Sequence, residues 1–91
     1  MKIENKISVI LPVYNSEEFI SKSIKSIINQ SYKSFELIII NDGSTDKTKE
    51  ICESFLKKDK RIVLINNTHK GLTASLNEAI RISNGKYIAR Q

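Results

Sequence analysis

The chain has 91 residues, and 15 Lys and Arg against 10 Asp and Glu give it a net charge of +5. Hydrophobic residues make up 40% and charged residues 27%, which is typical of one small globular domain and excludes a disordered chain. One cysteine, Cys52, excludes an intramolecular disulfide and a multi-cysteine zinc site. No apolar run approaches the roughly 18 to 20 residues of a transmembrane helix.

The basic residues are scattered along the chain, so the positive charge is weak evidence for nucleic-acid binding. It is better evidence for attraction to anionic ligands or to an anionic membrane surface. An unpaired cysteine fits a reducing compartment. We therefore expect a cytoplasmic location, either free or peripheral at the cytoplasmic face of the membrane.

The first elements in the chain are a strand and a helix. Residues 7–13 form a short, β-branched, nearly continuous apolar run, which predicts a strand buried on both faces. Over residues 17–30 the apolar positions switch to helical spacing, at Ile20, Ile24, Ile27 and Ile28. Asn15 followed by Glu18 resembles a capping box, so we expect Asn15 to cap this helix.

The same alternation continues to the end of the chain. Residues 35–40 predict a second buried strand, and the cluster 41–46 predicts a turn with Asp46 as the N-cap of a helix over 46–58. Residues 61–65 predict a third strand and 66–71 a loop. A third helix is expected over 72–84, with Asn84-Gly85 as its left-handed C-terminus, and a fourth strand over 86–89.

This order predicts an α/β fold: a Rossmann-like three-layer α/β/α arrangement around a parallel sheet of about four strands, with right-handed crossovers. Ligands of such sheets bind beyond the carboxyl ends of the strands. The segments 14–16, 41–46 and 66–71 are therefore the expected site. The glycine-rich phosphate loops G-x-G-x-x-G and G-x-x-x-x-G-K-[ST] are absent from the sequence, and so is a close D-x-D pair. These absences argue against a classical dinucleotide-binding domain and a P-loop ATPase.

Four segments together resemble one family. The segment 8–15 (SVILPVYN) resembles the opening strand of family 2 glycosyltransferases, the large inverting group with the GT-A fold. The segment 35–46 (FELIIINDGSTD) resembles their second strand and loop. The segments 70–80 and 85–89 resemble the third helix and fourth strand. The resemblance implies that residues 1–91 are the N-terminal nucleotide-binding part of a GT-A domain, without the acceptor-binding part.

The resemblance also implies a donor, a nucleotide-diphosphate sugar with a UDP-sugar favoured, and an acceptor that is a glycan, a lipid or another molecule. By position, Tyr14 resembles the aromatic that contacts the base, and Asp42 resembles the carboxylate that accepts a hydrogen bond from uracil N3. Pro12 and Asn15 lie at the same strand end, and Lys70 and Gly71 resemble a segment that reaches the base or phosphates. At position 76, where many relatives carry an arginine, this chain has Leu76.

Within the family, the fourth strand leads to an acidic motif that holds a divalent metal, Mg or Mn, and the catalytic base lies further on. Both are expected beyond Gln91, so the 91 residues are expected to hold no metal ligand and no catalytic residue and to be inactive alone. The fourth strand would be central in a complete sheet. Here it leaves an exposed sheet edge, which predicts self-association.

The residues alone leave other interpretations open. Asp42 before Gly43 also fits an Asx turn, and Tyr14 also fits a half-buried aromatic at a strand end. His69 and Lys70 fit exposed loop residues, and Cys52 fits core packing. The alternative function is a non-catalytic α/β module that binds a nucleotide or a protein. A receiver-type signalling domain ranks last, because its third strand would end in an aspartate.

Overall fold

The computed structural model describes residues 3–30, 34–68, 71–83 and 85–90, with only the backbone described for 3–5, 72 and 86–90. Strands and helices alternate as the sequence predicts: β1 (Ile3–Val13), α1 (Ile20–Ile28), β2 (Phe35–Asp42), α2 (Thr48–Leu56), β3 (Ile62–Asn67), α3 (Leu72–Ile82) and β4 (Gly85–Arg90). The four strands form one parallel sheet in the order β3-β2-β1-β4. The predicted fold class is confirmed.

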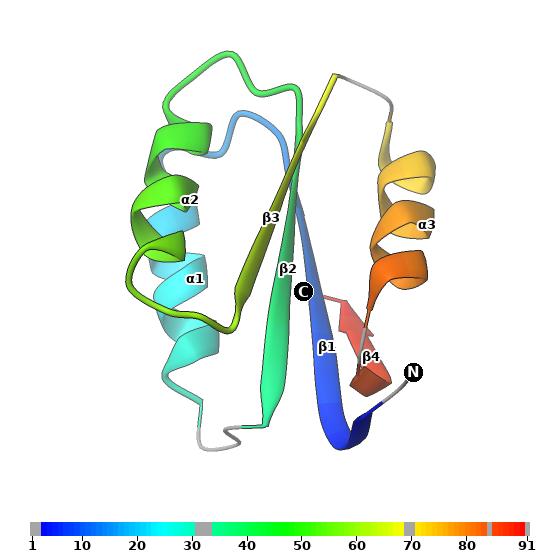
Figure 1. Cartoon of the computed structure of the whole chain (residues 1–91). Helices are drawn as coiled ribbons and strands as arrows, with labels where there is room; N and C mark the ends of the chain where they lie inside the picture. Colours follow the sequence, from blue (N-terminus) through cyan, green and yellow to red (C-terminus); the bar gives the residue numbers. More distant parts are fainter. Residues whose placement is uncertain (1–2, 31–33, 69–70, 84, 91) are drawn as a thin grey trace.

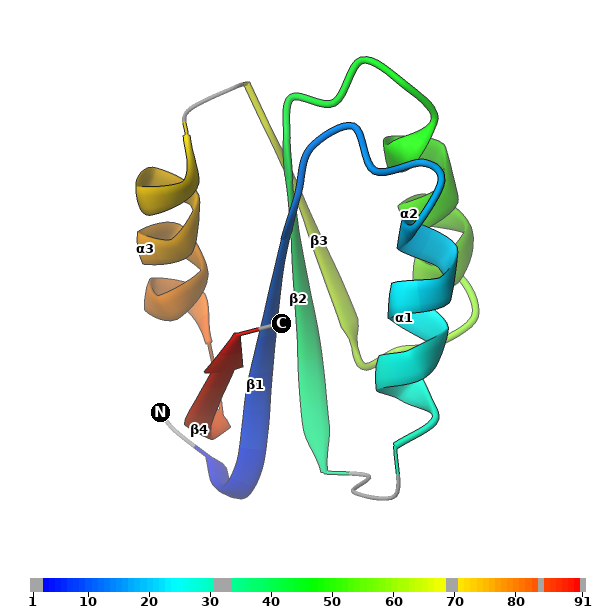
Figure 2. The ribbon, with the colours of Figure 1, turned by 180° about the vertical axis from the view of Figure 1, so that it is seen from behind.

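The helices cover the two faces of the sheet unequally. Helices α1 and α2 lie on one face and α3 lies on the other (Figures 1 and 2). The chain runs from β1 to β3 in one direction with both connections on the first face, and then crosses back to β4 over the opposite face. The connection to β4 runs in the opposite direction along the sheet and also lies on the opposite face. Because both change together, all the connections keep the same handedness, as in doubly wound folds.

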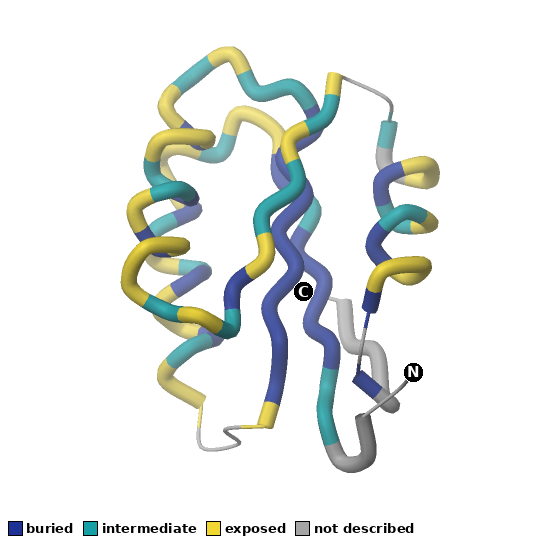
Figure 3. The backbone as a smooth tube through the Cα atoms, viewed as in Figure 1, coloured by how far each residue is buried: buried dark blue, intermediate teal, exposed yellow. Residues whose placement is uncertain are grey.

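Strand β2 carries the core. All eight of its residues are buried, because it has a strand on each side and a helix layer on each face (Figure 3). The larger apolar cluster lies under α1 and α2, and its members include Leu37, Ile39, Ile24, Cys52 and Phe55. A smaller cluster under α3 contains Ile10, Ile38, Ile40 and Ala79. Successive β2 side chains therefore serve opposite faces of the sheet.

Several predicted boundaries were wrong. β1 begins at Ile3 and β2 continues to Asp42, so Asn41 and Asp42 are strand residues and not turn residues. Helix α1 begins at Ile20, after a turn in which the amides of Phe19 and Ile20 bond to the Ser16 carbonyl. Phe19 is the cap residue of α1 and makes no side-chain capping bond, so the prediction that Asn15 caps this helix was wrong.

The predicted role of Gly85 as a left-handed helix end was also wrong, and Asn84 lies outside the described residues. Helix α3 ends at Ile82, its cap Ser83 is extended (φ −67°, ψ 142°), and Gly85 opens β4. The positive-φ glycines are Gly43 and Gly71. Gly85 is needed for a different reason: an added Cβ would lie 2.5 Å from the backbone nitrogen of Ser8.

Candidate functional site

The loops that leave the carboxyl ends of β2 and β3 turn to opposite faces of the sheet. The loop after Asp42 leads to α2 on one face, whereas the loop after Asn67 leads to α3 on the other (Figure 1). In open α/β sheets, ligands bind beyond the carboxyl ends of the strands, where such loops lie. The register pairs Asp42 directly with Asn67. Both residues therefore lie at the carboxyl ends of their strands, where the two loops begin.

Asp42 is the central side chain of this edge. It is 7% exposed, and its Oδ2 atom accepts a hydrogen bond of 3.0 Å from the Gly71 amide. The hydroxyl of Ser75, on α3, lies 3.5 Å from Oδ1. Asp42 and Gly71, both predicted as site residues, are therefore in contact across 29 residues of sequence.

The alternative interpretation of Asp42 was that it closes an Asx turn, but its neighbour Asn41 makes that bond. The Oδ1 atom of Asn41 accepts the Ser44 amide at 3.2 Å, which is the Asx-type bond that closes the turn. The Nδ2 atom of Asn41 donates to Oδ1 of Asn66 on β3 at 3.0 Å. Asn41 shapes the loop and ties β2 to β3, which leaves the Asp42 carboxylate directed to the other face and to α3.

Pro12 and Asp42 share a face of the sheet. The register pairs Pro12 with Ile40, and the alternation of side chains along a strand places Ile40 and Asp42 on the same face. Pro12 is half-buried there. Tyr14 follows the end of β1 and is 48% exposed, so its ring is accessible to a ligand at this edge.

Asn15 connects the loops that follow β1 and β2. It has φ of 47°, in the left-handed region that asparagine tolerates better than most residues. The side-chain Oδ1 atom of Asn15 accepts a hydrogen bond of 2.7 Å from the backbone amide of Thr45. The backbone amide of Asn15 donates to the Ser44 hydroxyl at 2.9 Å. These bonds replace the predicted capping role and hold the loop that carries Tyr14.

Two further contacts join the same loops. The Ser16 amide donates to the Thr48 hydroxyl at 2.8 Å, and the Glu17 amide donates to Oδ2 of Asp46 at 3.2 Å. Oδ1 of Asp46 also accepts the amide of Thr48, the first residue of α2, although the cap position itself is Lys47. Desolvation would raise the pKa of Asp46, but the hydrogen bonds from Thr48 and from the Glu17 backbone outweigh it and lower the pKa.

Lys70 and His69 lie outside the described residues, so their predicted roles stay predictions. Leu76, at the position where the resemblance implies an arginine in many relatives, packs against the apolar cluster under α3. Asn66 lies in the predicted site segment 66–71, whereas Ser75 was not predicted as a site residue. The position of Ser75, four residues before Ala79 on the sheet-facing side of α3, was the available indication, because both side chains are fully buried.

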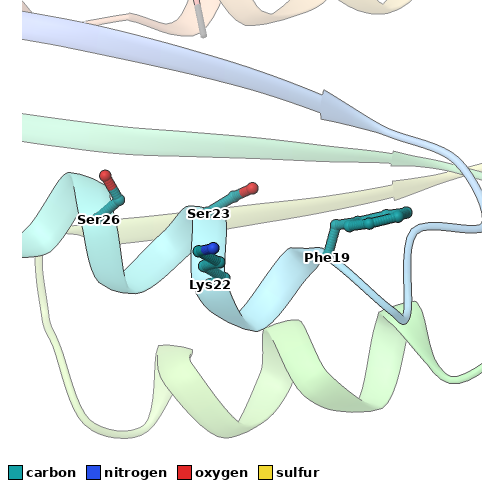
Figure 4. Close-up of a pocket in the computed structure, with 4 residues that line it drawn as sticks. All are labelled: Phe19, Lys22, Ser23 and Ser26. Carbon is teal, nitrogen blue, oxygen red and sulfur yellow. The ribbon is translucent and has the colours of Figure 1, made fainter.

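A separate hollow of about 280 Å³ lies along α1 and is lined by Phe19, Lys22, Ser23 and Ser26 (Figure 4). It contains none of the six predicted site residues. Phe19 is 68% exposed, so this hollow is open to solvent. It is therefore a surface feature of α1 and does not extend the edge at Asp42.

Within the described ranges, no three His, Cys, Asp or Glu side chains are grouped closely enough to hold a metal ion. The described part of the chain also contains no helix that is long and apolar enough to cross a membrane. The side chains placed at the carboxyl edge are hydrogen-bonding and aromatic groups. Groups of these kinds are suited to recognising a ligand.

An open parallel α/β sheet with an ordered polar edge defines a Rossmann-like ligand-binding domain. Comparison with known protein families identifies which domain of this class it is. The model of glycosyl transferase family 2 matches residues 8–91. The chain belongs to this family of enzymes. The resemblance of the four sequence segments to this family is thereby confirmed.

Curated relatives agree with this assignment. Glycosyltransferase GlyA of Streptococcus pneumoniae is 43% identical over 88 residues, and an uncharacterized glycosyltransferase of Haemophilus influenzae is 49% identical over 85 residues. The matches cover 97% and 92% of this chain, but only 13% and 26% of those proteins. The chain therefore spans a small part of the length of these relatives.

Solved structures show the same fold. The structure of S. aureus TarS 1–349 in complex with UDP-GlcNAc is 29% identical, with a TM-score of 0.83 over 93% of this chain and 25% of that chain. The mannosyltransferase PcManGT from Pyrobaculum calidifontis, in complex with GDP-Man and Mn²⁺, is 24% identical and also has a TM-score of 0.83. That match covers 90% of this chain and 25% of the mannosyltransferase chain.

Proposed function

We propose that this chain is the donor-binding part of an inverting glycosyltransferase, which transfers a sugar from a nucleotide-diphosphate sugar to a glycan, a lipid or another acceptor. Family membership supports a sugar-nucleotide donor. We favour a UDP-sugar, and the UDP-GlcNAc complex of the TarS neighbour supports that choice. A cytoplasmic location and a peripheral membrane association belong to the same proposal.

The observation that carries the proposal is the Asp42 carboxylate, buried and oriented at the carboxyl end of β2. Uracil presents its N3–H donor between two carbonyl acceptors, and a carboxylate accepts such a donor in a strong, charge-assisted bond. The Gly71 amide and the Ser75 hydroxyl restrict how the carboxylate can turn. A carboxylate has about four lone-pair sites, so it can accept several donors.

The other predicted residues have complementary roles in the proposal. Tyr14 covers the face of the base, and Pro12 lines the same pocket. Asn15 acts through its bonds to Ser44 and Thr45, which hold the Tyr14 loop in place. Lys70 and Gly71 lie in the segment that approaches the base or the phosphates.

Catalysis itself is proposed for a complete enzyme only. An inverting transfer needs a base that deprotonates the acceptor hydroxyl and a cation that stabilises the departing diphosphate. We propose neither role for a described residue of this chain. The divalent ion that the resemblance implies, Mg²⁺ or Mn²⁺, would supply that cation in the complete enzyme.

The test is calorimetric titration of the chain with UDP, with GDP and ADP as competing nucleotides. We expect binding that is selective for UDP. The Asp42→Asn substitution keeps the size of the side chain but removes its charge, so it should weaken UDP about ten- to hundred-fold. Circular dichroism checks that the variant is folded.

The matched control is Asp59→Asn, which removes a carboxylate before the amino end of β3. Asp59 pairs with Arg61 there, at 2.7 Å, and should not affect UDP binding. Equal affinity of the wild type and Asp42→Asn for UDP would refute the role of Asp42. Absence of binding to any nucleotide by the folded chain would favour the alternative, a non-catalytic protein-binding module.

A further inference from the structure

A buried hydroxyl joins three strands near the amino ends of β2 and β4, away from the proposed site. Ser8, on β1, is fully buried, and its Oγ atom donates to Oε2 of Glu36 on β2 at 2.6 Å. The same oxygen accepts the amide of Gly85, the first residue of β4, at 2.8 Å. One side chain therefore connects β2, β1 and β4, and the proposed binding of a nucleotide uses none of these residues.

Glu36 is unusual because a carboxylate is rarely buried in the middle of a sheet. It is 5% exposed, and the register pairs it directly with Ser8. Burying a charged group costs free energy unless hydrogen bonds compensate for it. The short bond from Ser8 has the length of a charge-assisted O–H···O⁻ bond.

Gly85 fits this arrangement because it has no side chain. A Cβ at this position would lie 2.5 Å from both the nitrogen and the Oγ atom of Ser8, and 2.8 Å from the Lys6 carbonyl oxygen. Such distances are far inside van der Waals contact. Glycine therefore permits the backbone of β4 to come close enough for its amide to reach the Ser8 hydroxyl.

The regular ladder is interrupted at this place. Ile3 pairs with Gly85 and Ile7 pairs with Tyr87, so four positions along β1 correspond to two along β4. An irregularity of this kind leaves residues of β1 unpaired and disrupts the backbone ladder locally. The bond from Gly85 to Ser8 supplies a fixed point just before the regular pairing resumes.

We propose that Ser8 and Glu36 are positioning residues that fix the register and attachment of β4 on β1. Strand β4 is parallel to β1, so its carboxyl end points to the edge that carries Tyr14 and Asp42. The Ser8–Glu36 pair thus sets how β4 is placed relative to that edge. This consequence rests on the proposed function, whereas the attachment of β4 does not.

Amide hydrogen exchange of the complete chain, measured by NMR without nucleotide, tests the attachment directly. Ser8→Ala removes the acceptor for the Gly85 amide and the donor to Glu36. We expect the protection of the β4 amides to fall about ten-fold or more, while the amides of β2 and β3 keep the protection set by global unfolding. Ser75→Ala, which removes another fully buried hydroxyl, is the control and should not affect β4 selectively.

A second substitution distinguishes positioning from general stability. Glu36→Gln keeps an oxygen that can accept from Ser8, so β4 protection should be largely retained. Glu36→Ala keeps the acceptor of the Gly85 amide but removes the group that orients the Ser8 hydroxyl, so it should lower β4 protection in the same direction as Ser8→Ala and by less. A uniform loss of protection across all strands in Ser8→Ala and Glu36→Ala would overturn the proposal. So would wild-type protection of β4 in both variants. Because no nucleotide is present, failure of this test is distinct from failure of UDP binding.

Discussion

At the scale of single residues, the carboxyl edge is ordered by backbone conformations that few residue types accept. Asn15 at φ 47° and Gly71 at φ 95° both lie in the left-handed half of conformational space. Each also makes a hydrogen bond to the loop or strand that it faces, Asn15 to Thr45 and Gly71 to Asp42. At both positions, the residue type suits the backbone conformation, and that conformation allows the hydrogen bond to form.

Asn15→Ala should lower the free energy of unfolding by about 1–3 kcal/mol, since it removes a hydrogen bond and places an L-residue with a Cβ in a disfavoured conformation. In Asn15→Gly, glycine adopts the same conformation without strain and only the hydrogen bond is lost. The free energy of unfolding should therefore fall by less, about 1 kcal/mol. Urea unfolding of the three proteins measures both. Equal losses in the two variants would show that the backbone conformation contributes nothing.

Gly71→Ala isolates backbone strain, because an added Cβ meets nothing within 4 Å. At φ 95° and ψ 161° an L-residue is strained by about 1–3 kcal/mol, and relief of that strain would move the amide away from Asp42. We expect lower stability and weaker UDP binding. A synthetic chain with D-alanine at this position should restore both, and equal behaviour of the L and D forms would contradict this account.

At the scale of elements, the helices show how far apolar spacing determines structure. The buried residues of α1 are Ile20, Ile24 and Ile27, as their spacing predicts. Cys52 is fully buried on α2, which confirms its predicted role in core packing. Helix boundaries were less predictable, because the side chains of Asn15 and Asp46 bond to another loop, and local sequence patterns do not report such contacts.

Burial in α2 should make Cys52 unreactive. Desolvation, with a smaller contribution from the charge of Glu53, raises the pKa of the thiol to about 11 from 9.0, so about one thousandth is thiolate at pH 8. An aromatic disulfide reagent should react slowly with the native chain and rapidly in urea. Rapid reaction of the native chain would show that α2 opens locally.

The same shift predicts a loss of stability at high pH. Because the folded pKa is raised, the thiol contributes stability that is fully present below about pH 9 and lost as the pH rises toward about 11. Unfolding of Cys52→Ala over this range is the control. If its pH dependence equals that of the wild type, the loss comes from other groups.

At the scale of the whole molecule, sheet order determines what is exposed. Strands β3 and β4 are the outer strands, and within the described residues no strand pairs with the outer edge of β4. An open edge of this kind is a template for another chain. We therefore expect a second copy of the chain to associate through β4.

Light scattering over micromolar concentrations tests this expectation. The apparent mass should rise with concentration toward that of a dimer or larger species. A constant monomer mass across the range would contradict it. Titration with UDP in the same experiment shows whether association and nucleotide binding are independent.

The amino-acid sequence by itself determined the alternation of elements and which residues lie at the carboxyl edge, where we propose the site. Continuous apolar runs such as 35–40 identify strands buried on both faces, and helical spacing identifies the apolar face of each helix. Both are local consequences of the backbone period. The position of Asp42 after such a run was enough to place it at a carboxyl end.

Only the tertiary structure decided which side chains meet. Asn41, and not Asp42, closes the turn, because the two adjacent strand residues face opposite sides of the sheet. Gly85 is required by the approach of β4 to Ser8, and not by the end of α3. The Asp42–Gly71 and Ser8–Gly85 contacts join residues 29 and 77 positions apart. Local propensity carries no information on such pairs, since they form only when the strands assemble in the order β3-β2-β1-β4.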